Sequence, residues 1–234
     1  MEFTRRTLLG GLAAVPLGLG GGRAAASARR ARRPVVATRE QWGAVAATAA
    51  IRVLDRAPDR IIVHHTGGAN ATDDSVAHAY ALSRSIQRFH MEGRGWSDIG
   101  EQLTISRGGH VMEGRTGSLA SIASGRLTVG AQVLGHNEHT LGIENEGTYM
   151  DVDVPEPLWT SLAETCAWLC AAYDLDPDDA IIGHRDLNAT DCPGDVLYAR
   201  LPELRQEVGA LLGRRVRAVR RGRVAGRHGA FRRD

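Results

Sequence analysis

The sequence predicts an α/β domain with a single central mixed β-sheet flanked by helices. Two observations carry this prediction. Short runs of β-branched and apolar residues alternate along the chain with longer segments of helical periodicity, and no internal repeat interrupts that alternation. At 234 residues the chain is long enough for one such domain with a substantial buried core and short extensions at both ends.

The first half of the domain is expected to hold a strand, a helix and a hairpin. Residues 60–64 form a short apolar, β-branched run, which is typical of a buried strand. Asp73 and Asp74 can cap a helix over residues 75–91, whose apolar side chains recur on one side. Across residues 102–112, two short apolar runs flank the sequence Arg-Gly-Gly, and this spacing predicts a β-hairpin.

The second half is expected to alternate strands with helices. Residues 140–145 read as a strand that a following glycine ends, and residues 155–173 read as the longest helix, with apolar side chains at helical spacing. Residues 180–183 read as a strand that ends next to His184, and residues 199–212 as a closing helix. Because strands and helices are interleaved, the simplest architecture is one sheet with helices packed on it.

The N-terminus has the features of an export signal. Arg5 and Arg6 form a twin-arginine pair, a mildly apolar run over residues 8–19 follows, and Ala26-Ser27-Ala28 supplies a small-x-small cleavage site. The apolar run is shorter than the roughly 20 apolar residues that a membrane span requires. We therefore expect the mature protein to be secreted by the twin-arginine route and to associate with the cell wall.

Charge is distributed unevenly along the chain. The formal net charge is only +2, yet both ends are rich in arginine, whereas acidic residues outnumber arginine between them. The C-terminal end reads as a disordered cationic tail, which would attach to an anionic wall polymer or would merely aid solubility. No specific nucleic-acid partner is expected, and the oligomeric state is left open, with a monomer as the simplest case. The chain thus divides into a signal peptide (1–28), a linker (29–37), one domain (38–212) and an Arg-rich tail (213–234).

Three cysteines are too few for a disulfide framework. Cys166 and Cys170 lie four residues apart in a predicted helix and read as two small core residues, with a bridge between them as the alternative in an exported protein. Cys192 differs from both, because it lies in the loop sequence Asp-Cys-Pro-Gly rather than in an apolar run.

Two separated fragments supply metal-binding side chains. His64 and His65 close one predicted strand, and His184 follows another. Neighbouring strands lie about 4.8 Å apart, so two such ends can hold imidazoles around one ion, and Cys192 follows His184 closely enough to fold back. Two imidazoles and one thiolate leave a fourth zinc position open, which is the arrangement of catalytic rather than structural zinc sites. The pattern indicates a hydrolase.

Several motifs occur together in a fixed order, among them Trp-Gly-Ala, Val-His-His-Thr, Gly-His-Arg-Asp and Cys-Pro-Gly. In these motifs the chain resembles the zinc-dependent N-acetylmuramoyl-L-alanine amidases, a family that includes peptidoglycan recognition proteins and bacterial anhydromuropeptide amidases. The resemblance covers residues 38–212 and suggests a secreted bacterial member. The matching segments are residues 39–44, 62–66, 96–100, 113–115, 141–147, 183–186 and 192–194.

The resemblance implies a zinc cofactor and a peptidoglycan substrate. His64, His184 and Cys192 would be the zinc ligands, although strand alternation alone leaves His65 as a competitor of His64. The bond to be cut would be the amide between N-acetylmuramic acid and the L-alanine of the stem peptide. Thr190 falls where family members carry a residue that stabilises the transition state.

The resemblance leaves two candidates for the general base. Glu144 falls where the anhydromuropeptide branch has its general base, and Glu101 stands where recognition proteins usually have a tyrosine that assists catalysis. A further departure is Gln132, at a position that is often histidine in the family. Glu144 is the first candidate and Glu101 the second. Alternatively, Glu144 is a buried strand carboxylate paired with Arg185.

Two other functions compete with the amidase. A non-catalytic recognition module would keep the cleft and bind peptidoglycan without cutting it, but the complete set of three ligands argues against this function. A zinc peptidase is disfavoured because neither a His-Glu-x-x-His nor a His-x-His signature is present.

Overall fold

A six-stranded mixed sheet runs through the centre of the computed structural model, which describes residues 31–213. Every pair of neighbouring strands is parallel except the antiparallel pair that forms the predicted hairpin. This arrangement confirms the α/β class and the predicted strands. In spatial order the strands are β1 (Val36–Ala37), β5 (Val111–Glu113), β4 (Leu103–Ile105), β7 (Thr140–Asn145), β3 (Arg60–His65) and β8 (Ile181–Gly183), while β2 (Val53–Leu54) and β6 (Leu127–Thr128) form a separate antiparallel ribbon.

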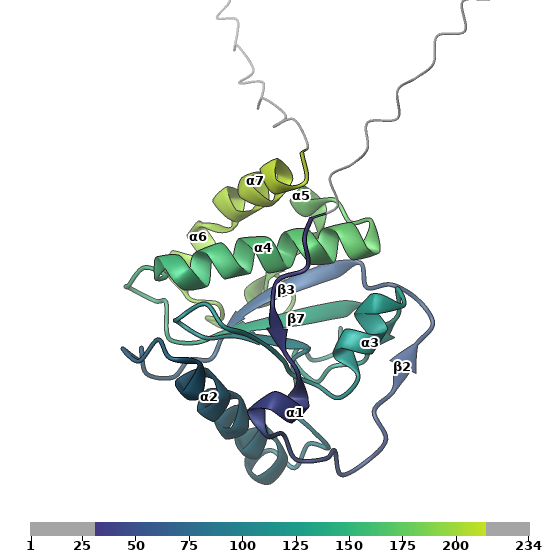
Figure 1. Cartoon of the computed structure of the whole chain (residues 1–234). Coiled ribbons are helices and arrows are strands. Elements are labelled where there is room, and N and C mark those ends of the chain that lie inside the picture. Colours follow the sequence, from purple (N-terminus) through teal and green to yellow (C-terminus); the bar gives the residue numbers. More distant parts are fainter. Residues whose placement is uncertain (1–30, 214–234) are drawn as a thin grey trace, which may run out of the picture.

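Helices lie on both faces of this sheet (Figure 1). One layer is built around the long helix α4, and the opposite side carries α1 and α2, which contact β5. The closing helix predicted over residues 199–212 is found as α7 (Leu201–Leu211), and a separate short helix, α6 (Asp195–Ala199), precedes it. The helices are α1 (Arg39–Trp42), α2 (Val76–Arg88), α3 (Ser118–Ala123), α4 (Glu156–Tyr173), α5 (Pro177–Ala180), α6 (Asp195–Ala199) and α7 (Leu201–Leu211), with a π-helical turn at Phe89–Gly93 and a 3₁₀ turn at His184–Asp186.

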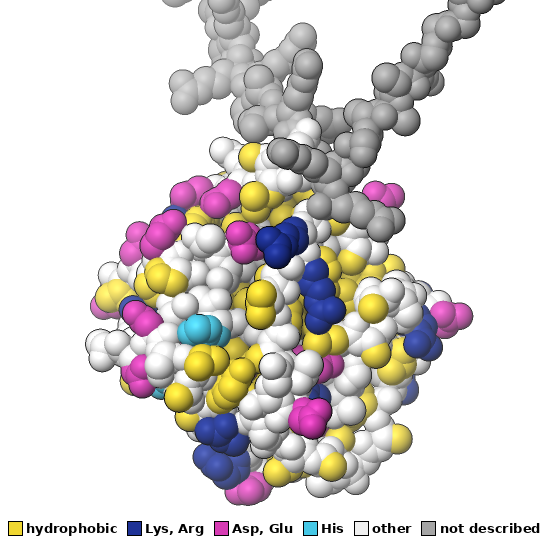
Figure 2. All heavy atoms as spheres, in the orientation of Figure 1, with side chains coloured by type: hydrophobic (Ala, Val, Ile, Leu, Met, Phe, Trp, Pro, Cys, Tyr) yellow, Lys and Arg dark blue, Asp and Glu magenta, His cyan; other side chains and the backbone are white. Residues whose placement is uncertain are grey.

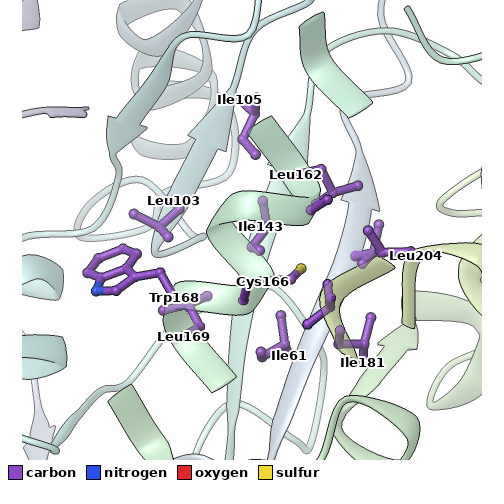
Figure 3. Close-up of a cluster of buried hydrophobic side chains, with 14 of the residues drawn as sticks. Ile61, Leu103, Ile105, Ile143, Leu162, Cys166, Trp168, Leu169, Ile181 and Leu204 are labelled. Atoms are coloured by element: carbon purple, nitrogen blue, oxygen red, sulfur yellow. The ribbon is translucent and has the colours of Figure 1, made fainter. Parts of the chain in front are cut away.

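The main core lies between the sheet and α4 (Figure 3). Ile61 and Val63 of β3 project into it, and so do Leu103 and Ile105 of β4. Because side chains alternate along a strand, the residues between them face the other side of the sheet. Cys166, close to the middle of α4, is fully buried in this core, as expected of a small core residue.

Near the carboxyl ends of β3 and β7, the opposite face of the central strands carries polar side chains. His64 of β3, Glu144 of β7 and Thr104 of β4 are paired in register on three neighbouring strands, so their side chains lie in one row. The same strands therefore supply the core on one face and, on the other, polar side chains that can form a site.

The sheet begins earlier than the sequence indicated. Val36 and Ala37, assigned above to the linker over residues 29–37, form β1 and pair in parallel with Val111 and Met112. The linker prediction is wrong for these two residues. A strand of two residues is too short to leave a periodic signal, and its position comes from pairing with β5.

Helix α2 differs from its prediction at both ends. Ser75, not Asp73 or Asp74, is the N-cap, because its side chain accepts a hydrogen bond from the backbone of His78 at 3.2 Å. The α-helix ends at Arg88 and is followed directly by the π-helical turn Phe89–Gly93. That turn reorients the chain toward the segment that contains Trp96.

The predicted signal peptide and most of the Arg-rich tail lie outside the described residues. Among the described residues, no helix combines the length and the apolar character needed to cross a membrane. On the face drawn in Figure 2, acidic and basic side chains are scattered among apolar ones.

Candidate metal centre

Three predicted metal ligands meet at the carboxyl ends of β3 and β8. His64 lies next to the last residue of β3, His184 directly follows β8, and Cys192 reaches them from the loop before α6. Their potential ligand atoms all lie within 4.8 Å of one another, and no other such group of three occurs among residues 31–213. The parallel pairing of β3 with β8 is what brings the two histidines together.

The spacing of the ligand atoms of His64 and Cys192 fits tetrahedral zinc. Zn–N and Zn–S bonds of about 2.05 and 2.3 Å at a tetrahedral angle separate the nitrogen from the sulfur by about 3.6 Å. His64 Nδ1 and Cys192 Sγ are 3.6 Å apart. The rings of His64 and His184 have centroids 4.6 Å apart at 62°, so they meet edge-on rather than stacked. The donor set and its geometry therefore suit a zinc ion with one open position.

The loop that carries Cys192 is held by backbone contacts. The amide of His65 donates to Cys192 Sγ at 3.4 Å, and the amide of Arg185 donates to the Cys192 carbonyl at 3.0 Å. Gly194 has a φ of 93°, and a Cβ at this position would lie 2.4 Å from the carbonyl oxygen of Tyr149. Only glycine allows this close approach, which returns the loop to the strand ends.

The structure separates His64 from His65. His64 is buried, and its ring faces His184 and Cys192. The ring of His65 instead accepts a hydrogen bond at Nδ1 from the backbone of Tyr149 at 3.3 Å. Strand alternation places the two rings differently, and of the two only His64 belongs to the group.

The pKa values of His64 and His184 are both lowered, which favours neutral imidazole rings. Burial, together with the nearby His184, lowers the pKa of His64 to about 3. Burial also lowers the pKa of His184, although the hydrogen bond that Asn188 Oδ1 accepts from its ring acts in the opposite direction. Burial and then the charge of Glu144 raise the pKa of the Cys192 thiol. The imidazoles are therefore ready to bind a metal, whereas the thiol needs a nearby cation in order to ionise.

A cleft of about 360 Å³ opens onto the three ligands and holds both candidate bases. Glu101 is almost fully buried, and its Oε1 accepts a hydrogen bond from Thr104 at 2.9 Å. Burial raises the pKa of Glu101 to about 7, and burial together with the charge of Glu101 raises the pKa of Glu144. Because the two carboxylates repel each other, the charge of one disfavours ionisation of the other.

Glu144 is not paired with Arg185, so that alternative is wrong. The Arg185 guanidinium binds Asp195 at 2.7 Å and stacks on Tyr198 outside the cleft. The side chain of Glu144, whose carboxylate takes part in no hydrogen bond within residues 31–213, lines the cleft beside the ligands. Thr190 also lines the cleft, is exposed, and accepts a hydrogen bond at Oγ1 from the Cys192 amide at 3.2 Å, which leaves its hydroxyl hydrogen free to donate.

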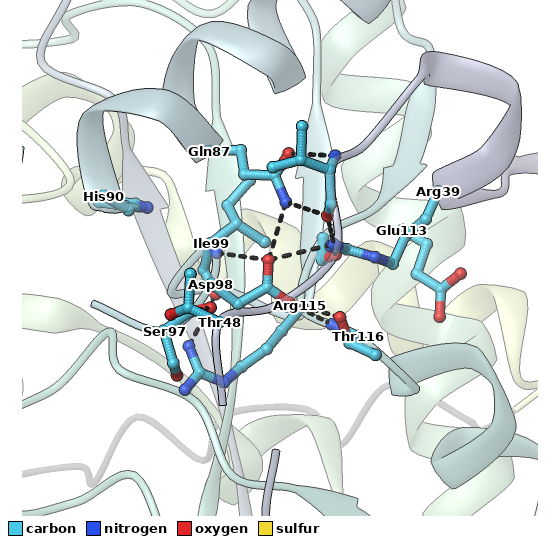
Figure 4. Close-up of polar contacts among 12 residues, drawn as sticks. Arg39, Thr48, Gln87, His90, Ser97, Asp98, Ile99, Glu113, Arg115 and Thr116 are labelled. Atoms are coloured by element: carbon cyan, nitrogen blue, oxygen red, sulfur yellow. Dashed lines mark hydrogen bonds and ion pairs between the residues drawn. The ribbon is translucent and has the colours of Figure 1, made fainter. Parts of the chain in front are cut away.

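The loop before β4 is held by the buried carboxylate of Asp98 (Figure 4). Asp98 accepts hydrogen bonds at Oδ1 from Arg39 (3.1 Å) and Gln87 (2.9 Å), and at Oδ2 from the Thr116 hydroxyl (2.6 Å). Trp96, two residues before it, stacks on His90 and lines the cleft. These hydrogen bonds connect the loop that contains Trp96 and Asp98 to α1 and α2.

Sequence reasoning did not identify His90 and Asn188 as parts of the site. His90 lies on the π-helical turn and accepts a hydrogen bond from the Gly100 amide at 3.2 Å. Asn188 contacts His184. His90 lies outside the recognised motifs, and Asn188 lies between two of them without belonging to either. The fold brings His90 to the cleft and Asn188 to the ring of His184. A histidine at the end of a predicted helix was the one available signal for His90.

Comparison with known proteins identifies related sequences. Residues 54–195 match the family described as N-acetylmuramoyl-L-alanine amidase. The chain is 34% identical over 167 residues to human N-acetylmuramoyl-L-alanine amidase, a match that covers 70% of this chain and 27% of that protein. It is 30% identical over 164 residues to peptidoglycan recognition protein 1 of Bos taurus, covering 70% of this chain and 80% of that protein. The chain thus spans about a quarter of the length of the human amidase.

Solved structures of related proteins share the fold. Drosophila PGRP-SD has a TM-score of 0.64 at 26% identity, with 73% of this chain and 95% of that chain covered. Peptidoglycan recognition protein-LE, solved in complex with tracheal cytotoxin, has a TM-score of 0.62 at 27% identity, with 72% of this chain and 92% of that chain covered. The central mixed sheet with flanking helices is common to these proteins and this chain.

Proposed function

The chain belongs to the N-acetylmuramoyl-L-alanine amidase family, and we propose that it is a zinc-dependent hydrolase that cleaves the amide between N-acetylmuramic acid and L-alanine in peptidoglycan. The observation that carries this proposal is the group His64, His184 and Cys192, with its 3.6 Å nitrogen–sulfur spacing, at the base of a cleft. A protein that only binds peptidoglycan does not need three metal-binding side chains grouped in this way. The proposal includes export by the twin-arginine route.

An amide resists water because resonance stabilises it and the amine is a poor leaving group. When bound to the three ligands, zinc would supply Lewis acidity, which activates water near neutral pH and polarises a carbonyl group. The thiolate of Cys192 would leave the site with a net charge of about +1.

Glu144 is the proposed general base. Its carboxylate lines the cleft on the strand next to His64 and is not engaged by other described side chains, so it can take a proton from water and return that proton to the departing alanine nitrogen. Glu101 is held by Thr104 and almost fully buried, which suits it to tune Glu144 rather than to reach the substrate.

Thr190 is proposed to stabilise the developing negative charge. Its hydroxyl oxygen already accepts a hydrogen bond from the Cys192 amide, so the hydroxyl hydrogen points elsewhere and can be donated to the substrate oxygen. Donors of this kind contribute about 3 kcal/mol to transition-state stabilisation in other hydrolases.

Product analysis tests the function. Peptidoglycan is incubated with the mature protein, residues 29–234, with a chelator, and with a chelator followed by excess zinc. An amidase releases stem peptides with a free N-terminal L-alanine, the chelator abolishes this release, and zinc restores it. Tight binding to peptidoglycan with stoichiometric zinc but no new amine would instead establish the second candidate, a recognition protein, which relatives named peptidoglycan recognition proteins make the main alternative.

A further inference from the structure

Each metal-binding histidine uses its second ring nitrogen to contact a side-chain amide. His64 Nε2 lies 2.5 Å from Gln132 Oε1, and His184 Nε2 lies 3.2 Å from Asn188 Oδ1. Gln132 belongs to the segment between β6 and β7, and Asn188 is connected to the same segment, because its Nδ2 donates to the carbonyl of Leu134 at 3.2 Å. One loop is therefore linked to both histidines.

The orientation of the Gln132 amide follows from its other contacts. The hydroxyl of Thr140 donates to the carbonyl of His136 at 2.9 Å, so Thr140 Oγ1 can only accept from Gln132, whose Nε2 lies 2.8 Å away. The amide must turn its NH₂ group toward Thr140 and its oxygen toward His64. His64 Nε2 must then carry the proton, which leaves the lone pair on Nδ1, the atom that faces Cys192.

The contacts of Asn188 fix the orientation of its amide as well. Its Nδ2 donates to two carbonyl groups, those of Leu134 at 3.2 Å and Leu187 at 3.0 Å, so its oxygen faces His184. A carbonyl oxygen can only accept, and His184 Nε2 is therefore the protonated nitrogen. Nδ1 is left as the nitrogen of His184 that can bind a metal.

Strand β7 leaves space for this arrangement. A Cβ at Gly142 would lie 2.8 Å from both Cγ and Cδ of Gln132 and 2.9 Å from its Oε1. These are closer than any real contact of a Cβ, so a larger residue at position 142 would displace the Gln132 side chain from His64. Gly142 lies on the same face of β7 as Glu144, because side chains alternate along the strand.

We propose that Gln132 and Asn188 are positioning residues that set the tautomer and the orientation of the two zinc-binding histidines, and that Gly142 provides the space that Gln132 needs. This inference rests on the zinc site of the proposed function. A ligand histidine is commonly oriented by a partner at its second nitrogen. An amide does this without adding negative charge, which preserves Lewis acidity in a site where a thiolate already reduces the charge of the metal.

Zinc affinity, measured by competition with a chromophoric chelator, tests the proposal without relying on activity. Gln132→Met keeps the length of the side chain but cannot accept a hydrogen bond of comparable strength, and it should weaken zinc binding about 10- to 100-fold. Gln132→Glu keeps an acceptor and should bind zinc at least as tightly as the parent chain. Gln206→Met, on helix α7 away from the site, is the matched control and should change nothing.

Gly142 permits a double-mutant cycle. Gly142→Ala should weaken zinc binding while Gln132 is present and should add little in a Gln132→Ala background, where the space is already free. Thermal unfolding of the zinc-free variants and the visible spectrum of the cobalt-loaded proteins separate an altered metal site from a general loss of fold.

The possible outcomes distinguish the two proposals. Failure of the parent chain to bind zinc would refute the proposed function itself. If the parent chain binds zinc and Gln132→Met binds it equally well, the zinc site stands and the positioning role of Gln132 is wrong. Additive effects in the cycle would show that Gly142 acts independently of Gln132.

Discussion

Glu144 and Glu101 have different surroundings although both face one cleft. Glu144 lies in register with His64, whereas Glu101 is buried and receives a hydrogen bond from Thr104. We expect Glu144→Gln to lower kcat by about 100-fold or more while zinc binding is retained, because the proton acceptor alone is lost. Steady-state kinetics on a soluble muropeptide, with zinc content measured in parallel, test this expectation. An unchanged kcat would exclude Glu144 as the base.

We expect Glu101 to influence the pH dependence of kcat/KM. Its negative charge helps to raise the pKa of Glu144, so its replacement in Glu101→Gln should lower that pKa. A base with a lower pKa stays ionised in more acidic solution, and the acid limb of kcat/KM should therefore move to lower pH. If Glu101→Gln instead abolishes turnover as completely as Glu144→Gln, Glu101 is the base.

At the scale of elements, Asp98 joins the loop before β4 to α1 and α2. Burial alone would raise the pKa of Asp98, but hydrogen bonds from Thr116 and Gln87 and the charge of Arg39 outweigh burial and lower it. We expect Asp98→Asn to lower the free energy of unfolding by about 3 kcal/mol at neutral pH, because Arg39 loses its buried partner.

The stability lost in Asp98→Asn should decrease as the pH falls. A carboxyl whose pKa is lower in the folded state stabilises the fold above its unfolded pKa of about 3.9, and that contribution disappears as the pH falls through the folded pKa. The difference in unfolding free energy between the parent chain and Asp98→Asn should therefore shrink below about pH 4. Urea titrations at several pH values measure it, and a constant difference would contradict the assignment.

Helix α4 stabilises the site from behind the sheet. Leu162 is fully buried against the core face of the strands that carry His64 and Glu144 on their other side. Leu162→Ala should cost about 2–5 kcal/mol of stability through lost burial and a residual cavity. Denaturant unfolding tests this, and kcat of the fraction that remains folded should be nearly unchanged.

At the scale of the whole molecule, the arginine-rich ends contrast with an acidic middle. We propose that the C-terminal segment attaches the protein to an anionic wall polymer. A chain that ends at residue 213 should hydrolyse soluble muropeptides at the parent rate but bind teichoic-acid-containing walls more weakly. The parent chain's binding should weaken with added salt and the shortened chain's should not. If both chains bind the walls equally, the C-terminal segment does not attach the protein to the wall, and the alternative role in solubility stands.

Local patterns predicted much of the fold and the three residues of the candidate metal group. The strand at residues 140–145 and the long helix are found at or within a residue of their expected bounds, because a long apolar repeat with a period of two or 3.6 is a local property. The two-residue strand β1 was missed because it exists only through its pairing with β5.

The sequence by itself determined the class of the fold and the kinds of side chain in the candidate metal group, two imidazoles and a thiol in a fixed order. Only the tertiary structure decided that His64 rather than His65 faces Cys192, and that Arg185 binds Asp195 instead of Glu144. It alone brought Gln132 to His64. The physical reason is the same in each case. Which side chains meet depends on sheet order and strand register, and these join residues that are far apart in the chain.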